Sequence, residues 1–177
     1  PNPIKFEEEV YSAYFSYDPI SINLDFENEW LRYRYSSLTT PNSIYEYNMR
    51  TGERKILKQI EIPDGFDPTE YESQRLYAVA KDNRKVPISL VYKKGLVLNG
   101  NNPLLLNGYG AYGGYEDPRF STDRISLLNR GFVFAIAHVR GGAELGREWY
   151  EDGKLLNKKN TFTDFIACAE HLIKEGY

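Results

Sequence analysis

RGFVFAIAHVRGG, at residues 130–142, is the stretch of this 177-residue chain that most restricts its fold. Its centre, Phe132 to Val139, is an almost unbroken apolar run. Such a run is typical of a strand that is buried on both faces of a parallel sheet. A glycine-rich loop, residues 140–142, follows it, and we expect Arg140 and Glu144 to hold that loop. The stretch therefore predicts an α/β arrangement.

The residues before this strand repeat the pattern. Pro103 opens the apolar run Leu104 to Leu106, and a glycine-rich loop follows at residues 108–114. Apolar residues at 125, 127 and 128 then predict a short helix that ends at Gly131. Still earlier, residues 75–80 and 86–92 flank Asp82-Asn83 and predict a hairpin.

The last segment predicts a helix over residues 161–175. Thr161 is the expected N-cap, with Asp164 as its capping-box partner, and Gly176 is the expected C′ residue. Cys168 should pack as a small hydrophobe. The apolar stripe expected to face the core comprises Phe162, Phe165, Ile166, Ala169, Leu172 and Ile173. Strand, loop and helix thus occur twice, as in a parallel sheet with right-handed crossovers.

The first seventy residues have a different character. Residues 30–36, 43–49 and 54–62 predict short antiparallel strands, the last two joined by a turn at Thr51-Gly52. Such strands suit a sandwich or a propeller blade. Turn residues at 63–65 and 67–68 mark a border near residue 70. We therefore expect one domain over residues 1–70 and another over 71–177.

Composition excludes several classes of protein. Lys and Arg total 22 against 25 Asp and Glu, and this near-neutral balance argues against nucleic-acid binding. One Cys and two His leave no basis for a disulfide framework or a metal site, and no cofactor is implied. No apolar run is long enough to span a membrane, and no signal peptide is visible. A cytoplasmic location is the expectation.

Charge is unevenly distributed along the chain. Residues 1–70 carry a net charge of −6 and residues 71–177 a net charge of +3. Between Lys5 and Arg32 there are seven acids and no base, which we interpret as a solvated face or, alternatively, a subsite for basic ligands. Because the chain begins at Pro1 and its only Met is Met49, we interpret it as a piece of a longer protein.

The loop GYGAYG at residues 108–113 has the GxGxxG pattern but allows three interpretations. A dinucleotide site would require a helix to open at once and offer its amides to the pyrophosphate, whereas Glu116, Asp117 and Pro118 follow. In an oxyanion loop, Tyr109 would donate to the charge that develops on a carbonyl oxygen. In a purely structural turn, Tyr109 would pack in the core.

The chain resembles the prolyl oligopeptidase family of serine peptidases, and within it the oligopeptidase B branch. The resemblance lies in PLLLNGYGAYGG at residues 103–114, in residues 130–177, and in YSSLTTPNSIYEYN at residues 35–48. It implies the end of a seven-bladed β-propeller, followed by the N-terminal part of the parallel sheet of an α/β-hydrolase domain.

The resemblance also implies roles for individual residues. Tyr109 matches the family's oxyanion donor, while Asn107 stands where a Tyr is common. Asp117 and Tyr112 match substrate-binding positions. Arg119 stands where the branch carries a second acid for basic substrate side chains.

The catalytic triad implied by the resemblance is not found in this sequence. No GxSxG nucleophile motif occurs, and Ser, Asp and His would lie in that order beyond the helix at residues 161–175. His138 is expected to be a core histidine and His171 a partly exposed helix residue. These 177 residues alone should therefore not hydrolyse peptides.

The leading hypothesis is part of an oligopeptidase that cleaves short peptides after Arg or Lys through an acyl-enzyme. The alternatives are a post-proline peptidase and a non-catalytic binding or scaffolding protein with the same fold. An open apolar sheet edge is expected where the nucleophile strand would pair. The expected partners are a short peptide substrate and, at this edge, the rest of the catalytic domain or another copy.

Overall fold

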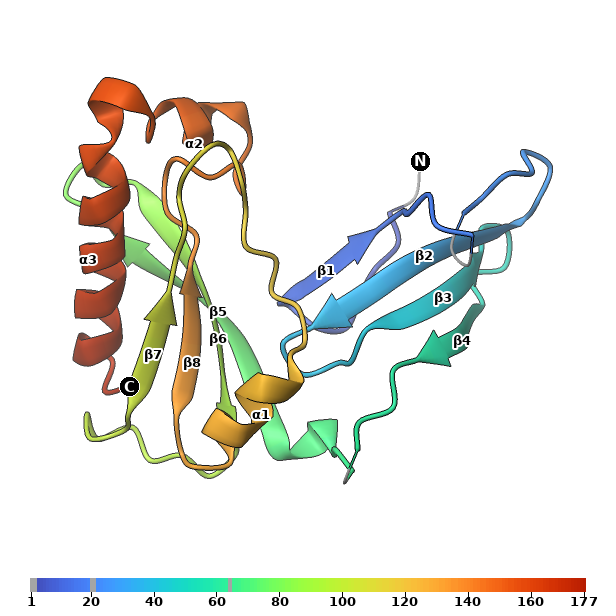
Figure 1. The fold of residues 1–177 in the computed structure, drawn as a ribbon, viewed down its shortest axis with the longest axis horizontal. Helices are drawn as coiled ribbons and strands as arrows, with labels where there is room; N and C mark the ends of the chain where they lie inside the picture. The colour runs from blue at the N-terminus through green and yellow to red at the C-terminus, as the bar shows by residue number, and fades with distance from the viewer. Residues whose placement is uncertain (1–2, 20–21, 64) are drawn as a thin grey trace. The chain divides into compact units, whose positions relative to one another are not determined.

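A computed structural model describes residues 3–19, 22–63 and 65–177, so Asp64 of the predicted boundary turn lies outside the described residues. The chain divides into two compact units. The first comprises residues 1–68 and 118–122, and the second comprises residues 69–117 and 123–177 (Figure 1).

The first unit is a four-stranded antiparallel sheet with the strands in sequence order. Its strands are β1 (Tyr11–Tyr14), β2 (Trp30–Ser37), β3 (Ser43–Asn48) and β4 (Arg54–Gln59). The three strands predicted from sequence are confirmed, while β1 was not predicted. Gly52 has a φ of 79° in the turn between β3 and β4, a conformation that favours glycine.

Tyrosines form much of the interior of this unit. The rings of Tyr33 and Tyr45 stack with centroids 5.6 Å apart, and Phe6 stacks on Tyr35 at 5.2 Å. Tyr33 and Tyr35 are buried on β2, and alternation along the strand places both on the same face. The high tyrosine content of the sequence therefore serves as core material in this sheet.

The acid-rich segment of the first unit is only partly a solvated face. The carboxylate of Glu8 accepts hydrogen bonds from hydroxyls of Tyr35 and Ser37, both at 2.5 Å, and of Thr39 and Thr40. Asp18 pairs with Arg34 at 2.9 Å. The solvated-face interpretation is wrong for these two acids, because each is held by groups from later in the chain.

The second unit is a mixed sheet in the order β5-β6-β8-β7, with β7 and β8 parallel. Its strands are β5 (Tyr71–Val79), β6 (Lys85–Lys93), β7 (Leu104–Asn107) and β8 (Val133–Ala137). The helices are α1 (Thr122–Leu128), α2 (Arg147–Glu151) and α3 (Lys159–Lys174), with 3-10 turns η1 (Pro68–Glu70) and η2 (Leu155–Asn157). These elements confirm the predicted hairpin, both later strands and both predicted helices.

Strand β8 is buried along its whole length, as its sequence predicts. Val133, Ala135 and Ala137 belong to the core cluster that also contains Cys168 and Leu172 of α3. On the other face, the guanidinium of Arg124 from α1 lies 4.0 Å from the ring centroid of Phe134. Helices α3 and α1 therefore cover opposite faces of this strand (Figure 1).

Helix α3 differs from its sequence prediction in two respects. Its N-cap is Lys158, so Thr161 lies inside the first turn and Asp164 is not a capping-box partner. The buried side chains are Thr161, Asp164, Cys168 and Leu172. The predicted stripe is wrong for Phe162, Ile166 and Ile173, which are exposed, because polar contacts of Thr161 and Asp164 turn a different face inward.

Apolar surface consequently remains open at two places in the second unit. Phe162, Ile166 and Ile173 lie on the outer face of α3. Strand β7 pairs only with β8 among the described residues, and Leu105 on it is exposed. Within the same residues, no helix is both long enough and apolar enough to cross a membrane.

Cys168 is fully buried against this sheet, as expected for a small hydrophobe. Burial raises the pKa of its thiol to about 12, and the reactive thiolate is therefore scarce at pH 8. We expect no alkylation by iodoacetamide at pH 8 in the folded protein and full alkylation in urea, measured as added mass. Rapid labelling of the folded protein would contradict this packing.

Candidate functional site

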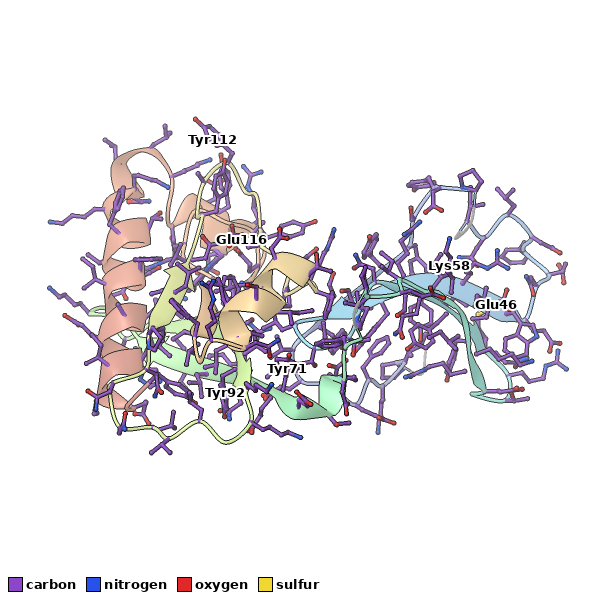
Figure 2. All side chains as sticks on the ribbon, turned by 60° about the horizontal axis from the view of Figure 1, so that its bottom comes forward. Glu46, Lys58, Tyr71, Tyr92, Tyr112 and Glu116 are labelled. Carbon is purple, nitrogen blue, oxygen red and sulfur yellow. The ribbon has the colours of Figure 1, made fainter. Side chains whose placement is uncertain are left out.

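The candidate site is the loop of residues 108–117, which follows β7 in the second unit. Gly110 and Gly113 adopt positive φ angles of 59° and 66°, and Tyr112 does so at 55°. Tyr109 is 53% exposed, so the interpretation in which it packs in the core is wrong. Tyr112 is 90% exposed and lies at the outer end of the loop (Figure 2).

The loop lacks the geometry of a dinucleotide site. The next helix in the sequence begins only at Thr122, so no helix opens directly after the glycines at residues 108–113 as the dinucleotide motif requires. Glu116 and the partly buried Asp117 occupy the intervening stretch. The arrangement instead leaves the Tyr109 side chain available to a bound molecule.

Asn107, the last residue of β7, forms a hydrogen bond across the loop. Its Nδ2 donates to Oε2 of Glu116 at 2.7 Å, and the labelled Glu116 lies inward of Tyr112 in Figure 2. The backbone N–H of Glu116 donates to Oε1 of Glu144 at 3.4 Å. Asn107, which departs from the common family residue, therefore has a definite structural part in this loop.

Two glycines, Gly141 and Gly153, allow backbone segments to pass in close contact with the loop. A Cβ on Gly141 would lie 2.2 Å from the carbonyl oxygen of Gly110, and one on Gly153 would lie 2.0 Å from the Gly141 nitrogen. The N–H of Gly113 donates to the Gly141 carbonyl at 3.0 Å. Only glycine fits at such a crossing, and the loop thereby rests on the segment that follows β8.

Arg140 is a buried charged residue in the segment after β8 on which the loop rests. It is 3% exposed, and its guanidinium donates to both carboxylate oxygens of the fully buried Asp164, at 2.8 and 2.6 Å. Nη1 also donates to Asp82 at 2.5 Å. These hydrogen bonds, first that with Asp164, raise the pKa of Arg140, and the one from Arg140 lowers the pKa of Asp82.

Helix α3 contacts the loop through its first turn. The ammonium of Lys158 donates to the carbonyl of Gly110. Thr161 Oγ1 donates to the carbonyl of Arg140 at 2.6 Å and lies 3.4 Å from that of Gly110. The loop is thus joined both to the segment after β8 and to α3.

His138 is a core residue, as expected. It is buried, and its Nε2 lies 2.6 Å from the hydroxyl oxygen of Ser89. Its Nδ1 lies 3.8 Å from Oε1 of Glu144 and has no hydrogen bond within the described residues. Because this histidine is shielded from solvent, it does not serve as an accessible base. His171 is partly exposed, as predicted.

A cavity of about 360 Å³ adjoins the loop. Tyr112 lines it, together with Tyr150, Lys154, Leu155 and Lys158. Leu155 has a φ of 47°, which is strained for a residue with a side chain, and it is exposed. Room for a bound group therefore exists beside Tyr112.

Sequence reasoning identified the loop but missed several residues that support it. The sequence pattern assigns Asp164, the partner of Arg140, to a helix cap, and it assigns no role to Lys158. The signal for Asp164 is its helical spacing. It lies three residues after Thr161 and four before Cys168, so these three residues share one face of the helix, and that face is the buried one. For Lys158 the signal was a cation at a helix start, where it is unfavourable.

Both parts of the chain match models of one peptidase family. Residues 4–60 match the N-terminal β-propeller domain of prolyl oligopeptidase, and residues 118–177 match the prolyl oligopeptidase family. The chain is 49% identical over 175 residues to dipeptidyl aminopeptidase BI of Pseudoxanthomonas mexicana. This match covers 98% of this chain and 23% of the relative. It is 35% identical over 147 residues to a prolyl endopeptidase of Elizabethkingia meningoseptica, over 83% of this chain and 21% of that protein.

Solved structures agree with these matches. Oligopeptidase B from Leishmania major superimposes with a TM-score of 0.86 at 41% identity, over 98% of this chain and 24% of that one. Oligopeptidase B from Trypanosoma brucei with covalently bound antipain superimposes with a TM-score of 0.86 at 45% sequence identity, and the match covers the same shares of the two chains. This chain therefore spans about a quarter of the length of its relatives. The predicted fold class, the end of a β-propeller followed by part of an α/β-hydrolase, is confirmed, and the chain belongs to the prolyl oligopeptidase family.

Proposed function

We propose that this chain is part of a serine peptidase that cleaves short peptides through an acyl-enzyme, with Tyr109 as an oxyanion donor. The single observation that carries the proposal is the exposed side chain of Tyr109 on a loop whose backbone is held by the segment after β8 and by α3. Family membership supplies the reaction class. A fixed donor of this kind stabilises the charge on a tetrahedral intermediate.

The chemistry requires groups that lie outside residues 1–177. A serine would attack the scissile carbonyl, a histidine would accept its proton, and an aspartate would orient that histidine. No GxSxG motif occurs in this sequence, and the chain covers about a quarter of its relatives. We therefore place the triad in the remainder of a longer protein, where Tyr109 would meet the carbonyl oxygen.

For specificity, we propose cleavage after Arg or Lys. The resemblance of the sequence to the oligopeptidase B branch supports this choice and would make Asp117 and Tyr112 substrate-binding residues, and solved structures of oligopeptidase B are among the matches. Arg119 weighs against a two-acid subsite, and its guanidinium lies over the Tyr14 ring at 4.8 Å. Relatives named prolyl endopeptidase keep post-proline cleavage as the second candidate.

We further propose that the rest of the hydrolase domain covers the β7 edge and the outer face of α3, with a boundary between domains near residue 70. The exposed Leu105 and Phe162 support this, because apolar surface of this kind is normally buried. A cytoplasmic location is part of the proposal and rests on the single, buried cysteine. A second copy of the chain is the alternative occupant.

A fluorophosphonate probe tests the proposal on the full-length protein. We expect one covalent adduct, on a serine beyond residue 177, and loss of peptidase activity with it. Peptides that differ only in Arg, Lys or Pro before the scissile bond then separate the two specificities, with Arg and Lys expected to be cleaved fastest. The absence of an adduct and of cleavage would support the scaffolding alternative.

A further inference from the structure

Lys158 stands where a helix disfavours a cation. It is the N-cap residue of α3, and it is followed by Lys159. The N-terminal end of a helix carries the positive end of the helix dipole, so the dipole does not stabilise two lysines there. The ammonium of Lys158 instead reaches a carbonyl 48 residues away in the chain, that of Gly110. The contact that holds this lysine is therefore with the oxyanion loop.

The carbonyl of Gly110 depends on that ammonium for a strong hydrogen bond. Thr161 Oγ1 lies 3.4 Å from this carbonyl oxygen but only 2.6 Å from that of Arg140. A hydroxyl has one hydrogen to donate, and the shorter contact takes it. Lys158 is then the effective donor to Gly110 among the described residues.

Gly110 directly follows Tyr109 in a loop with glycines at 108, 110, 113 and 114. Glycine adopts more backbone conformations than other residues, so contacts from outside the loop select its conformation, and the Tyr109 side chain is half exposed. Two of the bonds that anchor the loop are the bond from Gly113 to Gly141 and the bond from Lys158 to Gly110, and the second is the one directly next to Tyr109. Loss of either anchor would let the phenol drift from its place.

We propose that Lys158 is a positioning residue for Tyr109, and that its ammonium fixes the Gly110 carbonyl so that the phenol meets the oxyanion. This inference rests on the proposed function, since it assigns Lys158 a part in the oxyanion site. In this proposal Lys158 acts through the loop backbone and not through a bond to substrate. A displacement of about 1 Å at a catalytic group can cost up to about a hundredfold in rate, which makes the effect measurable.

The test is a double-mutant cycle in the full-length peptidase, with kcat and KM measured on one peptide. Lys158→Met keeps the apolar stem and removes the donor, and we expect kcat to fall about tenfold with KM changed less than about twofold. Lys158→Arg restores a donor and should recover most of the rate. Lys159→Met removes a neighbouring exposed charge as the matched control and should leave kcat unchanged.

Tyr109→Phe provides the second arm of the cycle. If Lys158 acts through Tyr109, Lys158→Met should lower kcat by less than about twofold once the phenol is gone. An equal effect in both backgrounds, or no effect in either, overturns the positioning role while leaving the peptidase assignment intact. If Tyr109→Phe itself has no effect on kcat, the oxyanion role of Tyr109 fails, and the role of Lys158 fails with it.

Discussion

The Tyr109→Phe variant of the full-length peptidase is expected to turn over peptide about a hundredfold more slowly than the native protein, with a much smaller change in KM. The substitution removes one hydroxyl from a side chain that is 53% exposed, so packing is preserved. The lost hydrogen bond is one that strengthens as charge develops on the carbonyl oxygen. Such a bond lowers the barrier more than it binds substrate. Steady-state hydrolysis of a single peptide measures both constants.

Tyr115→Phe is the matched control for this result. Tyr115 belongs to the same loop and is also exposed, and its hydroxyl has no proposed part in catalysis. We expect its kcat to stay within about twofold of the native value, because an exposed hydroxyl that does not contact the reacting groups removes no transition-state interaction. Equal losses in the two variants, or a native kcat for Tyr109→Phe, would contradict an oxyanion role for Tyr109.

Asp164→Asn is expected to destabilise the second unit by about 3–5 kcal/mol, the cost of removing the buried partner of an ion pair, because the carboxylate that remains on Arg140, that of Asp82, is half exposed. Asp164 is fully buried and accepts from Nε and Nη2 of Arg140, and also from the Arg140 backbone N–H at 3.0 Å. The asparagine cannot neutralise the guanidinium. Urea denaturation followed by the fluorescence of the buried Trp149 measures the loss.

Two further variants separate burial from pairing. Asp82→Asn removes the other carboxylate on Arg140, but the Asp82 side chain is 48% exposed, and we expect a loss of about 1 kcal/mol or less. The double variant Arg140→Met with Asp164→Leu should be less destabilised than Asp164→Asn, because no charge is left buried. A cost for Asp164→Asn as small as that for Asp82→Asn would show that the pair is not a buried anchor.

Acid should weaken the same network at its exposed end. The hydrogen bond from Arg140 lowers the pKa of Asp82 in the folded chain. Its contribution to stability is therefore present above the range in which free aspartates titrate, and it is lost as the pH falls through the lower, folded pKa. In the Asp82→Asn variant, this part of the acid sensitivity should be absent.

Local patterns in the sequence determined much of this fold. The apolar run at residues 132–139 predicts a buried strand because period and composition are visible in the chain itself, and β8 is buried throughout. The glycine-rich loop after Leu104–Leu106 was likewise predicted, as was the helix that became α3. Resemblance of residues 35–48, 103–114 and 130–177 to a known family supplied the fold class and the candidate donor.

The inward face of α3 and the support of the loop were decided only by tertiary structure. Helical spacing placed Phe162 and Ile166 toward the core, yet Asp164 faces inward because Arg140, 24 residues earlier, pairs with it there. Helical spacing alone cannot reveal such a partner. Burying an acid is costly unless a counter-charge pairs with it, and this counter-charge lies in another segment of the chain. The contact of Lys158 with Gly110 spans 48 residues. It arises where α3 meets the loop after β7, a meeting that depends on the whole sheet and is not encoded in either segment alone.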